Sequence, residues 1–291
     1  KSQAQEIRQI QDNIVSWKAG TEGEKQLLVG DLLDGAGSPG SDWYAFTIAR
    51  MGEEKENQAA YLSRLQDAVE NVYADLEDSK TRYRLSDIHR MALTVMACGG
   101  DPENFGTDPD GDSINLIRDS VWNSLWGDPG DQGINGYIWA LLTIDAKNYQ
   151  EPEGAEWTRD KIISELLSRQ LADGGFGLVK TDPSDVDLTS MTLTALAPYQ
   201  GQDKTYTVVN IVTNKEETVT VDEVAEQAFD QMEDSVLEFW DCEKVIDQQI
   251  RQELEKRFGF VYPYESRRDI PVKVSVSDLK KRSYHEETDF E

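Results

Sequence analysis

Four short segments of the sequence repeat one another at intervals of about 50 residues. Each contains an Asp or Asn that serves as its anchor, and these anchors are Asp42, Asp87, Asn135 and Asp187. Six residues after each anchor stands an Ile or a Leu, and three residues later stands a Met, an Ile or a Leu. This spacing predicts one amphipathic helix in each copy. Because such a helix buries its apolar stripe only against neighbours, the repeat predicts stacked helical hairpins.

The apolar period, together with the positions of Gly, Pro and Asp, places helices along most of the chain. A first helix is predicted at about 3–18, and a Gly- and Ser-rich connection at 34–41 leads into the helix that begins near Asp42. Three helix pairs are predicted after it, at 58–76 with 87–97, 113–126 with 135–145, and 158–171 with 187–197. The sequence therefore predicts an all-α fold.

The pattern changes after Pro198. Alternating β-branched residues at 205–212 and 217–221, on either side of Asn214, predict a small β-hairpin near 205–221. A charged helix at about 222–256 is expected next, and the end of the chain does not continue the repeat. We predict a repeat domain at 1–235 and a C-terminal extension at 236–291.

Composition and net charge make some classes of binding partner unfavourable for this chain. The chain has 291 residues, of which 38% are hydrophobic, and a formal net charge of −27. This charge disfavours nucleic acid and anionic membranes as partners. No run approaches the roughly 20 apolar residues that a membrane helix needs, so no membrane insertion is expected. We expect a monomer without a cofactor that binds a small molecule or a protein.

The fourth copy carries the most specific motif. Gln170-Leu-Ala-Asp-Gly-Gly-Phe176, followed by the acidic start of the helix at 185–196, resembles the terpene cyclase and prenyltransferase repeat family. In that family a Gln-x3-Gly-x-aromatic turn precedes an inner helix that is opened by acidic residues. The resemblance covers about 1–235, and it implies an α/α toroid whose inner helices surround a central cavity.

Two further stretches, 133–142 and 196–199, look most like secreted or surface-anchored toroid proteins of Gram-positive gut bacteria. That resemblance implies an extracellular or cell-surface location. A closed ring of six hairpins would need nearly the whole chain, but only four complete hairpins can be counted. We therefore predict an incomplete toroid.

The end of the chain resembles a different protein. Arg257-Phe-Gly-Phe-Val-Tyr-Pro-Tyr264 and the stretch 270–281 look like a segment of the A-type subunit of the ATP-dependent helicase/nuclease in Gram-positive recombinational repair. The resemblance covers about 250–285. No Gly-x4-Gly-Lys-Ser/Thr phosphate loop occurs in the sequence, and no nuclease strand follows the segment. We expect this portion neither to hydrolyse ATP nor to cut DNA.

Two acids in the fourth copy are the best catalytic candidates. Cyclases of the family protonate an alkene with the middle Asp of an Asp-x-Asp-Asp-Thr motif, and Asp187 matches that position while Asp185 matches the first. Leu188 stands where the last acid of the motif would be. The alternative, which applies to all four anchors, is that an Asp or Asn just ahead of a helix caps its free N–H groups.

Two groups of residues are candidate metal ligands. His89 and Cys98 lie nine residues apart on one predicted helix, about 13 Å along its axis and on opposite faces, so they cannot share a zinc ion. A second group has the spacing of a calcium loop and consists of Asp108, Asp110, Asp112 and Asp119. Ser113 replaces the usual Gly of such a loop, which favours an acidic turn instead.

Aromatic residues gather around the starts of the predicted inner helices. The candidate ligand-binding residues are Trp43, Tyr44, His89, Tyr137 and Trp139, and Trp122 belongs to the same aromatic set. Aromatic residues at such spacing usually pack in the core, but in a toroid those near the helix starts would surround the cavity mouth. The sequence favours a non-catalytic binding module with its ligand at that mouth. The alternatives are a terpene cyclase-like enzyme with Asp187 as general acid, and a DNA-repair scaffold that acts through the C-terminal segment.

Overall fold

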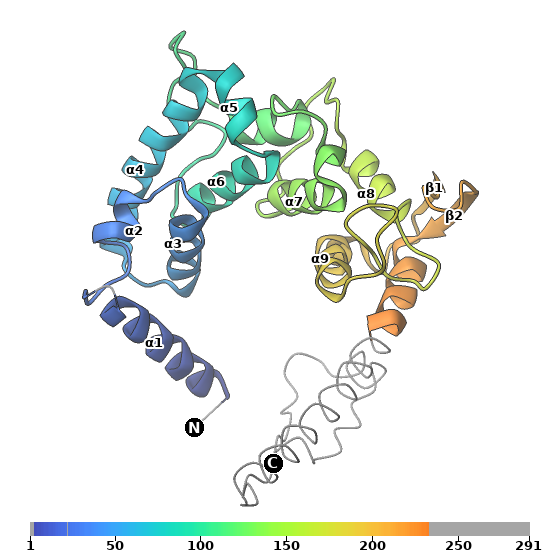
Figure 1. The fold of residues 1–291 in the computed structure, drawn as a ribbon, viewed down its shortest axis with the longest axis horizontal. Coiled ribbons are helices and arrows are strands. Elements are labelled where there is room, and N and C mark those ends of the chain that lie inside the picture. The colour runs from blue at the N-terminus through green and yellow to red at the C-terminus, as the bar shows by residue number, and fades with distance from the viewer. Residues whose placement is uncertain (1–2, 22, 233–291) are drawn as a thin grey trace, which may run out of the picture. The chain divides into compact units, whose positions relative to one another are not determined.

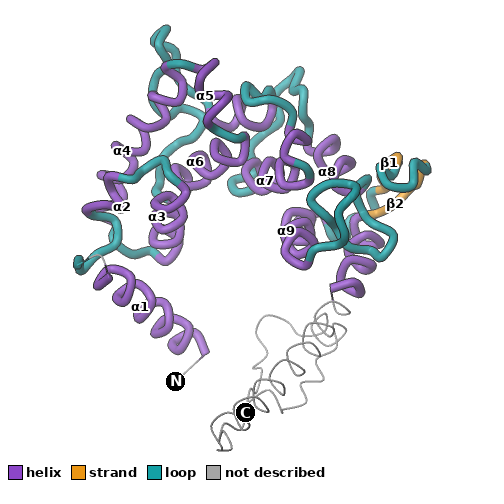
Figure 2. The backbone as a smooth tube through the Cα atoms, viewed as in Figure 1, coloured by secondary structure: helices purple, strands orange, loops and turns teal. Residues whose placement is uncertain are grey.

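The computed structural model describes residues 3–21 and 23–232 of the chain. These residues are mostly helical, and their strands are confined to one small hairpin (Figure 2). The predicted all-α class with a β-hairpin is thereby confirmed. The chain divides into two compact units between Leu166 and Leu167. The domain boundary that we predicted at 235 lies outside the described residues.

Unit 1 ends within the last turn of α8. The elements of this part of the chain are α1 (Gln3–Thr21), α2 (Gly30–Asp34), α3 (Pro39–Met51), α4 (Lys55–Ala74), α5 (Leu76–Arg82), α6 (Leu85–Ala97), η1 (Arg118–Trp122), η2 (Pro129–Gln132), α7 (Ile134–Asp145) and α8 (Arg159–Leu167). The predicted helices at 3–18, 87–97, 135–145 and 158–171 correspond to α1, α6, α7 and α8.

Unit 1 has a helical layer built from the repeated helices. Helix α6 packs between α3 and α7, while α4 contacts both α3 and α6 and continues into α5 (Figure 1). The residues six positions after the three anchors of unit 1 are buried, and they are Ile48, Leu93 and Leu141; the fourth, Leu193, is buried within unit 2. Each fully buried aliphatic side chain of this kind contributes about 1.5–3 kcal/mol. The repeated apolar stripe therefore forms the core, as the sequence predicts.

Two predicted helices differ from the structure. The segment 58–76 is divided at Asp75, whose backbone leaves the helical region and whose side chain caps α5 by accepting a hydrogen bond from Asp78 N. The segment 113–126 is largely irregular, with an isolated bridge between Thr107 and Ser113 and the five-residue π-helix η1. Here the backbone of Ile114 pairs with Phe105 and Gly106, so Ile114 is buried outside any helix.

Unit 2 contains α9 (Val186–Leu196), the short 3-10 helix η3 (Ala197–Tyr199), β1 (Thr205–Val209) and β2 (Glu216–Thr220). The two strands are antiparallel, with Thr205 opposite Thr220, and Asn214 adopts a positive φ of 55° in the turn that joins them. Tyr206 and Val208 are buried, and the alternate residues Thr205, Thr207 and Val209 are exposed. A helix follows at 221–232, and the rest of the charged helix predicted at 222–256 lies outside the described residues.

In the part of the chain that the structure describes, no helix is both long enough and apolar enough to span a membrane. The closure of the predicted toroid stays a prediction.

Candidate functional site

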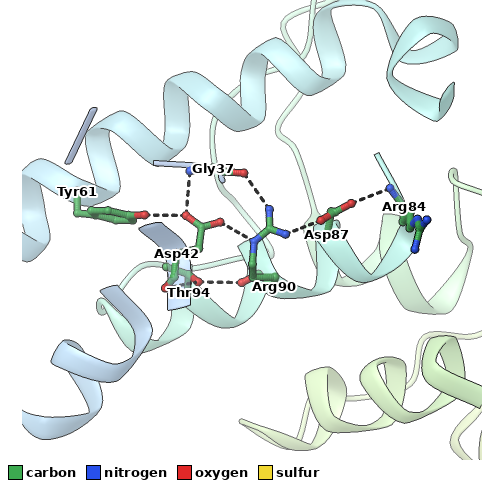
Figure 3. Close-up of polar contacts among 7 residues, drawn as sticks. All are labelled: Gly37, Asp42, Tyr61, Arg84, Asp87, Arg90 and Thr94. Carbon is green, nitrogen blue, oxygen red and sulfur yellow. Dashed lines mark hydrogen bonds and ion pairs between the residues drawn. The ribbon is translucent and has the colours of Figure 1, made fainter. Parts of the chain in front are cut away.

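The first anchor, Asp42, belongs to a buried ion pair (Figure 3). Asp42 of α3 is fully buried, and its Oδ2 atom accepts a hydrogen bond from Nε of Arg90 of α6 at 2.9 Å. Its Oδ1 atom accepts hydrogen bonds from Gly37 N at 2.8 Å and from the Tyr61 hydroxyl at 2.7 Å. The guanidinium also donates from Nη2 to Gly37 O at 2.8 Å. The carboxylate is thus completely enclosed by donors, which is the condition for a buried charge pair to persist.

The same guanidinium reaches the second anchor. Nη1 of Arg90 lies 2.5 Å from Oδ1 of Asp87, and Oδ2 of Asp87 accepts a hydrogen bond from Arg84 N at 2.9 Å (Figure 3). Burial and the Asp42 carboxylate raise the pKa of the Tyr61 hydroxyl, so Tyr61 is a fixed donor. Burial, followed by Asp42, also raises the pKa of the Cys98 thiol to about 12, which makes this cysteine an unreactive core residue. The network joins two repeats, and its central pair, Asp42 and Arg90, is buried.

The anchors do not share one capping function. Asp87 does close the first turn of α6, because it accepts a hydrogen bond from the residue that precedes the helix. Asp42 lies within α3 and binds the backbone of Gly37 instead. Asn135 lies in the first turn of α7, and its buried Oδ1 atom has no hydrogen-bond partner among the described residues. The prediction that all four anchors cap helices is therefore wrong for Asp42 and Asn135.

The fourth anchor also differs from the capping prediction. Helix α9 begins at Val186, and its N-cap is Asp185, whose Oδ1 atom accepts a hydrogen bond from Leu188 N at 2.9 Å. Asp187 is exposed in the first turn. Asp185, two residues before Asp187, therefore takes the capping position that the sequence offered for Asp187.

The Gln170–Phe176 motif acts as a structural clamp within unit 2. Nε2 of the buried Gln170 donates to Gly174 O and to Val224 O, both at 2.8 Å. The fully buried Phe176 donates from its backbone N to Oγ1 of Thr189 of α9 at 3.0 Å. Gly174 has a φ of 93°, and a Cβ there would lie 2.5 Å from a backbone oxygen of the helix at 221–232. The motif thus ties the turn to α9 and to that helix.

Asp119, the last acid of the calcium-like spacing, is engaged elsewhere. It is buried in η1, accepts a hydrogen bond from the Tyr73 hydroxyl at 3.0 Å, and pairs with Arg118 at 2.5 and 3.0 Å. Burial, followed by Asp119, raises the pKa of the Tyr73 hydroxyl. The carboxylate of Asp119, which would be the ligand at position 12 of a calcium loop, is therefore already hydrogen-bonded to other protein groups.

The remaining acids of that loop form a turn. Oδ1 of Asp108 accepts hydrogen bonds from Asp110 N at 3.0 Å and from Asp112 N at 2.9 Å. Across residues 3–21 and 23–232, no group of three or more His, Cys, Asp or Glu side chains is arranged to hold a metal ion.

His89 is fully buried in α6. Its Nε2 atom lies 2.8 Å from Ser120 O, so the proton is on Nε2, because a carbonyl oxygen only accepts. Burial lowers the pKa of His89 to about 4. Nδ1 of His89 and Oγ of Ser120 each have no hydrogen-bond partner among the described residues. The sequence predicted His89 as a ligand-binding residue. In the structure its side chain is buried and cannot contact a ligand at the surface.

Two of the predicted ligand-binding residues come together in what we call the aromatic patch, formed by Trp43, Phe46 and Trp139. Trp43 of α3 and Trp139 of α7 have ring centroids 5.4 Å apart and ring planes tilted by 40°. Phe46 lies edge-on to Trp43 at 5.8 Å. Trp43 is 36% exposed, and the other two side chains are half-buried. Phe46 is not among the residues expected from the sequence, although its position one helical turn after Trp43 places it on the same face.

The other aromatic candidates lie apart from this patch. Tyr44 is half-buried, and the ammonium group of Lys18 lies 5.5 Å from the centre of its ring. Tyr137 is buried against Trp157, with ring centroids 5.4 Å apart. Trp122 is buried in η1 beneath Arg159. These residues pack in the protein, which is the usual function of aromatic side chains at helical spacing.

An open hollow of about 440 Å³ lies between residues 100–103, after α6, and residues 147–150, after α7. It therefore lies at the C-terminal ends of these helices, whereas the predicted cavity mouth is at their starts. Burial, Glu103 and Asp101 raise the pKa of the Tyr149 hydroxyl in this hollow to about 12. A second hollow of about 320 Å³ lies beside the start of α8 and includes Trp157.

No protein-family model matches the chain, and no curated protein or solved structure matches it significantly.

Proposed function

We propose that the chain is a non-catalytic binding module of a bacterial surface or secreted protein, and that the aromatic patch of Trp43, Phe46 and Trp139 is its ligand site. The observation that carries this proposal is the pairing of two tryptophans from different helices, one of them 36% exposed. Tryptophan offers a large and rigid contact surface, and it is enriched among the residues that dominate binding energy. The ligand class that suits this patch is a ring with an apolar face.

The surroundings of Trp43 support the proposal, because they hold it in place. Trp43 directly follows Asp42, whose carboxylate is fixed by Gly37, Tyr61 and Arg90. A binding residue on a rigid helix loses little conformational freedom when a ligand arrives. The buried contacts of Asp42 therefore support the proposal by fixing the part of α3 that carries Trp43.

The cyclase alternative has weaker support. Protonation of an alkene needs a carboxylic acid and a dry cavity that stabilises the resulting cation. Asp187 is exposed, and Asp185 is also exposed and caps α9. The third possibility, a DNA-repair scaffold, depends on the segment at about 250–285, which lies outside the described residues.

The binding proposal is tested by calorimetric titration of the protein with a panel of soluble oligosaccharides and of peptides that contain proline or aromatic residues. We expect at least one panel member to bind, and Trp43→Ala to weaken its binding by on the order of tenfold or more. Leu178→Ala is the matched control, because Leu178 has a similar exposed fraction, 40%, and lies in unit 2.

Two results would contradict the proposal. One is that no panel member binds, and the other is that the Trp43→Ala protein binds as tightly as the native protein. Conversion of a polyprenyl substrate by the native protein, but not by Asp187→Asn, would instead support the cyclase alternative.

A further inference from the structure

Helix α1 presents its most apolar side chains to solvent. The exposed fractions are 51% for Ile7, 58% for Ile10, 58% for Ile14 and 68% for Trp17. These four residues recur at intervals of three, four and three positions, so they form one continuous stripe along the helix. We call them the α1 stripe. Contiguous apolar patches of more than a few hundred Å² are rare on monomeric proteins, and they mark interaction surfaces.

A face of α1 beside the stripe attaches the helix to unit 1 mainly through polar contacts. Nη1 of Arg8 donates to Met51 O at the end of α3, at 3.0 Å, and the same guanidinium pairs with Glu53. Lys18 lies over the ring of Tyr44, and Ala19 is buried. Helix α1 is thus held at the edge of unit 1, near the end of α3 (Figure 1), and the α1 stripe is exposed. An amphipathic helix normally turns its apolar face to the protein core and its polar face to solvent. The exposed α1 stripe therefore requires a partner surface.

In contrast to the monomer expected from the sequence, we propose that a second copy of this chain covers the α1 stripe, through an antiparallel pair of α1 helices related by a two-fold axis. The spacing of three, four and three positions reads the same in both directions. Reversal of one helix therefore places Ile7 opposite Trp17 of the other copy, and Ile10 opposite Ile14. Every layer of the pair is filled by two apolar side chains, in the a and d positions of a short coiled coil. A self-complementary surface of this kind is what a two-fold dimer requires.

Charge also favours a copy of the same helix at this place. The whole chain carries a net charge of −27, which opposes contact between most surfaces of two copies. Within α1, two acids, Glu6 and Asp12, balance two bases, Arg8 and Lys18. The positions that flank the stripe bring no two like charges together across the antiparallel pair. Helix α1 therefore has no net charge of its own, in contrast to the whole chain.

Sedimentation equilibrium of the full chain over a wide concentration range tests this proposal. We expect a reversible monomer–dimer equilibrium in the native protein. Ile10→Glu and Ile14→Glu should each raise the dissociation constant by at least tenfold, because they place a charge in an apolar layer. Val209→Glu is the control, because Val209 has a similar exposed fraction, 56%, and lies on β1. Circular dichroism shows whether the variants keep their helices.

A disulfide experiment tests the antiparallel orientation. All proteins carry Cys242→Ser, and one also carries Ile10→Cys while another carries Ile14→Cys. A mixture of the two should form the cross-linked dimer faster than either protein alone. A parallel pair would show the reverse order and would overturn the antiparallel arrangement.

A monomeric native protein, or a dimer that Ile10→Glu and Ile14→Glu leave intact, would overturn the proposal. Dimerisation that occurs only after residues 233–291 are deleted would also overturn it, since it would assign the α1 stripe to that segment. The ligand titration of Trp43→Ala is a separate measurement, so either proposal can fail without the other.

Discussion

At the scale of single residues, the most informative feature is how many polar groups unit 1 encloses. Asp42 and Arg90 are almost completely buried and fully hydrogen-bonded, whereas Nδ1 of the equally buried His89 has no partner among the described residues. Removal of one member of a buried ion pair typically costs about 3–5 kcal/mol, because the other charge remains buried alone. Buried polar residues therefore make this core specific for one packing but sensitive to substitution.

The buried histidine predicts a dependence of stability on pH. His89 has a pKa of about 4 in the folded protein and about 6.5 when unfolded, so the unfolded chain binds the proton first as the pH falls. The stability that this group contributes is complete above pH 6.5 and is lost as the pH falls towards 4. The expected loss in the free energy of unfolding is on the order of 3 kcal/mol.

Urea denaturation at a series of pH values measures this loss. His89→Gln is the comparison, because the acidic residues titrate in both proteins and cancel in the difference. The native protein should lose more stability than His89→Gln over this range. Parallel curves for the two proteins would show that His89 is not the group responsible.

At the scale of secondary-structure elements, the caps decide where helices begin, and their exact positions were the least predictable part of the fold. Asp185→Ala should lower the free energy of unfolding by about 1 kcal/mol, because the N–H group of Leu188 would lose its acceptor. Asp187→Ala should change it by less than about 0.5 kcal/mol, since Asp187 is exposed in the first turn. Thermal and urea denaturation of the two variants compares them directly. A larger loss of stability for Asp187→Ala than for Asp185→Ala would indicate that Asp187 is the capping residue.

The sequence was sufficient for elements whose apolar residues follow one period and pack in the core. Helix α6 is an example, because Ile88, Met91 and Val95 recur at helical spacing and are all buried. The prediction of a helix at 113–126 was wrong for a physical reason. Ile114 and Trp122 are also buried, but the first lies in an irregular segment that pairs with residues 105 and 106, and the second lies in a π-helix. An apolar period alone cannot distinguish these conformations.

The candidate site was predictable only in part. Trp43 and Trp139 were identified by their positions near the helix starts, and the structure brings them together. His89 and Tyr137, each two residues after its anchor, are buried in the protein instead. Side chains within one helical turn point both into the protein and towards solvent. The sequence alone did not show which of these aromatic and histidine side chains would be buried. The exposure of the α1 stripe was also not predicted, since an apolar face is normally expected to be buried.

At the scale of the whole molecule, the excess of acidic residues predicts a dependence of stability on salt. The chain has 56 Asp and Glu residues against 29 Lys and Arg residues, so like charges repel one another across the folded surface. Added NaCl screens this repulsion at distances beyond about 10 Å, whereas the buried Asp42–Arg90 pair is screened much less. The melting temperature should therefore rise by roughly a few degrees between low and moderate salt.

Differential scanning calorimetry in NaCl and in KCl provides the measurement. Equal increases in the two salts would identify screening as the cause, whereas a difference would indicate binding of a specific ion. A melting temperature that falls with added salt would mean that attractive surface pairs outweigh the repulsion.

The ion pair between Asp42 and Arg90 also has a consequence for how such a protein can evolve. The acid comes from the first copy of the repeat and the base from the second, so neither copy is chemically complete without the other. In arrays of interchangeable units, copies can be gained or lost by duplication and deletion of the gene segment. Here, loss of either copy would leave a bare charge inside the protein, and insertion of a copy between them would separate the pair. The order of these two units is therefore fixed by electrostatics, and their sequences are free to diverge only as a pair.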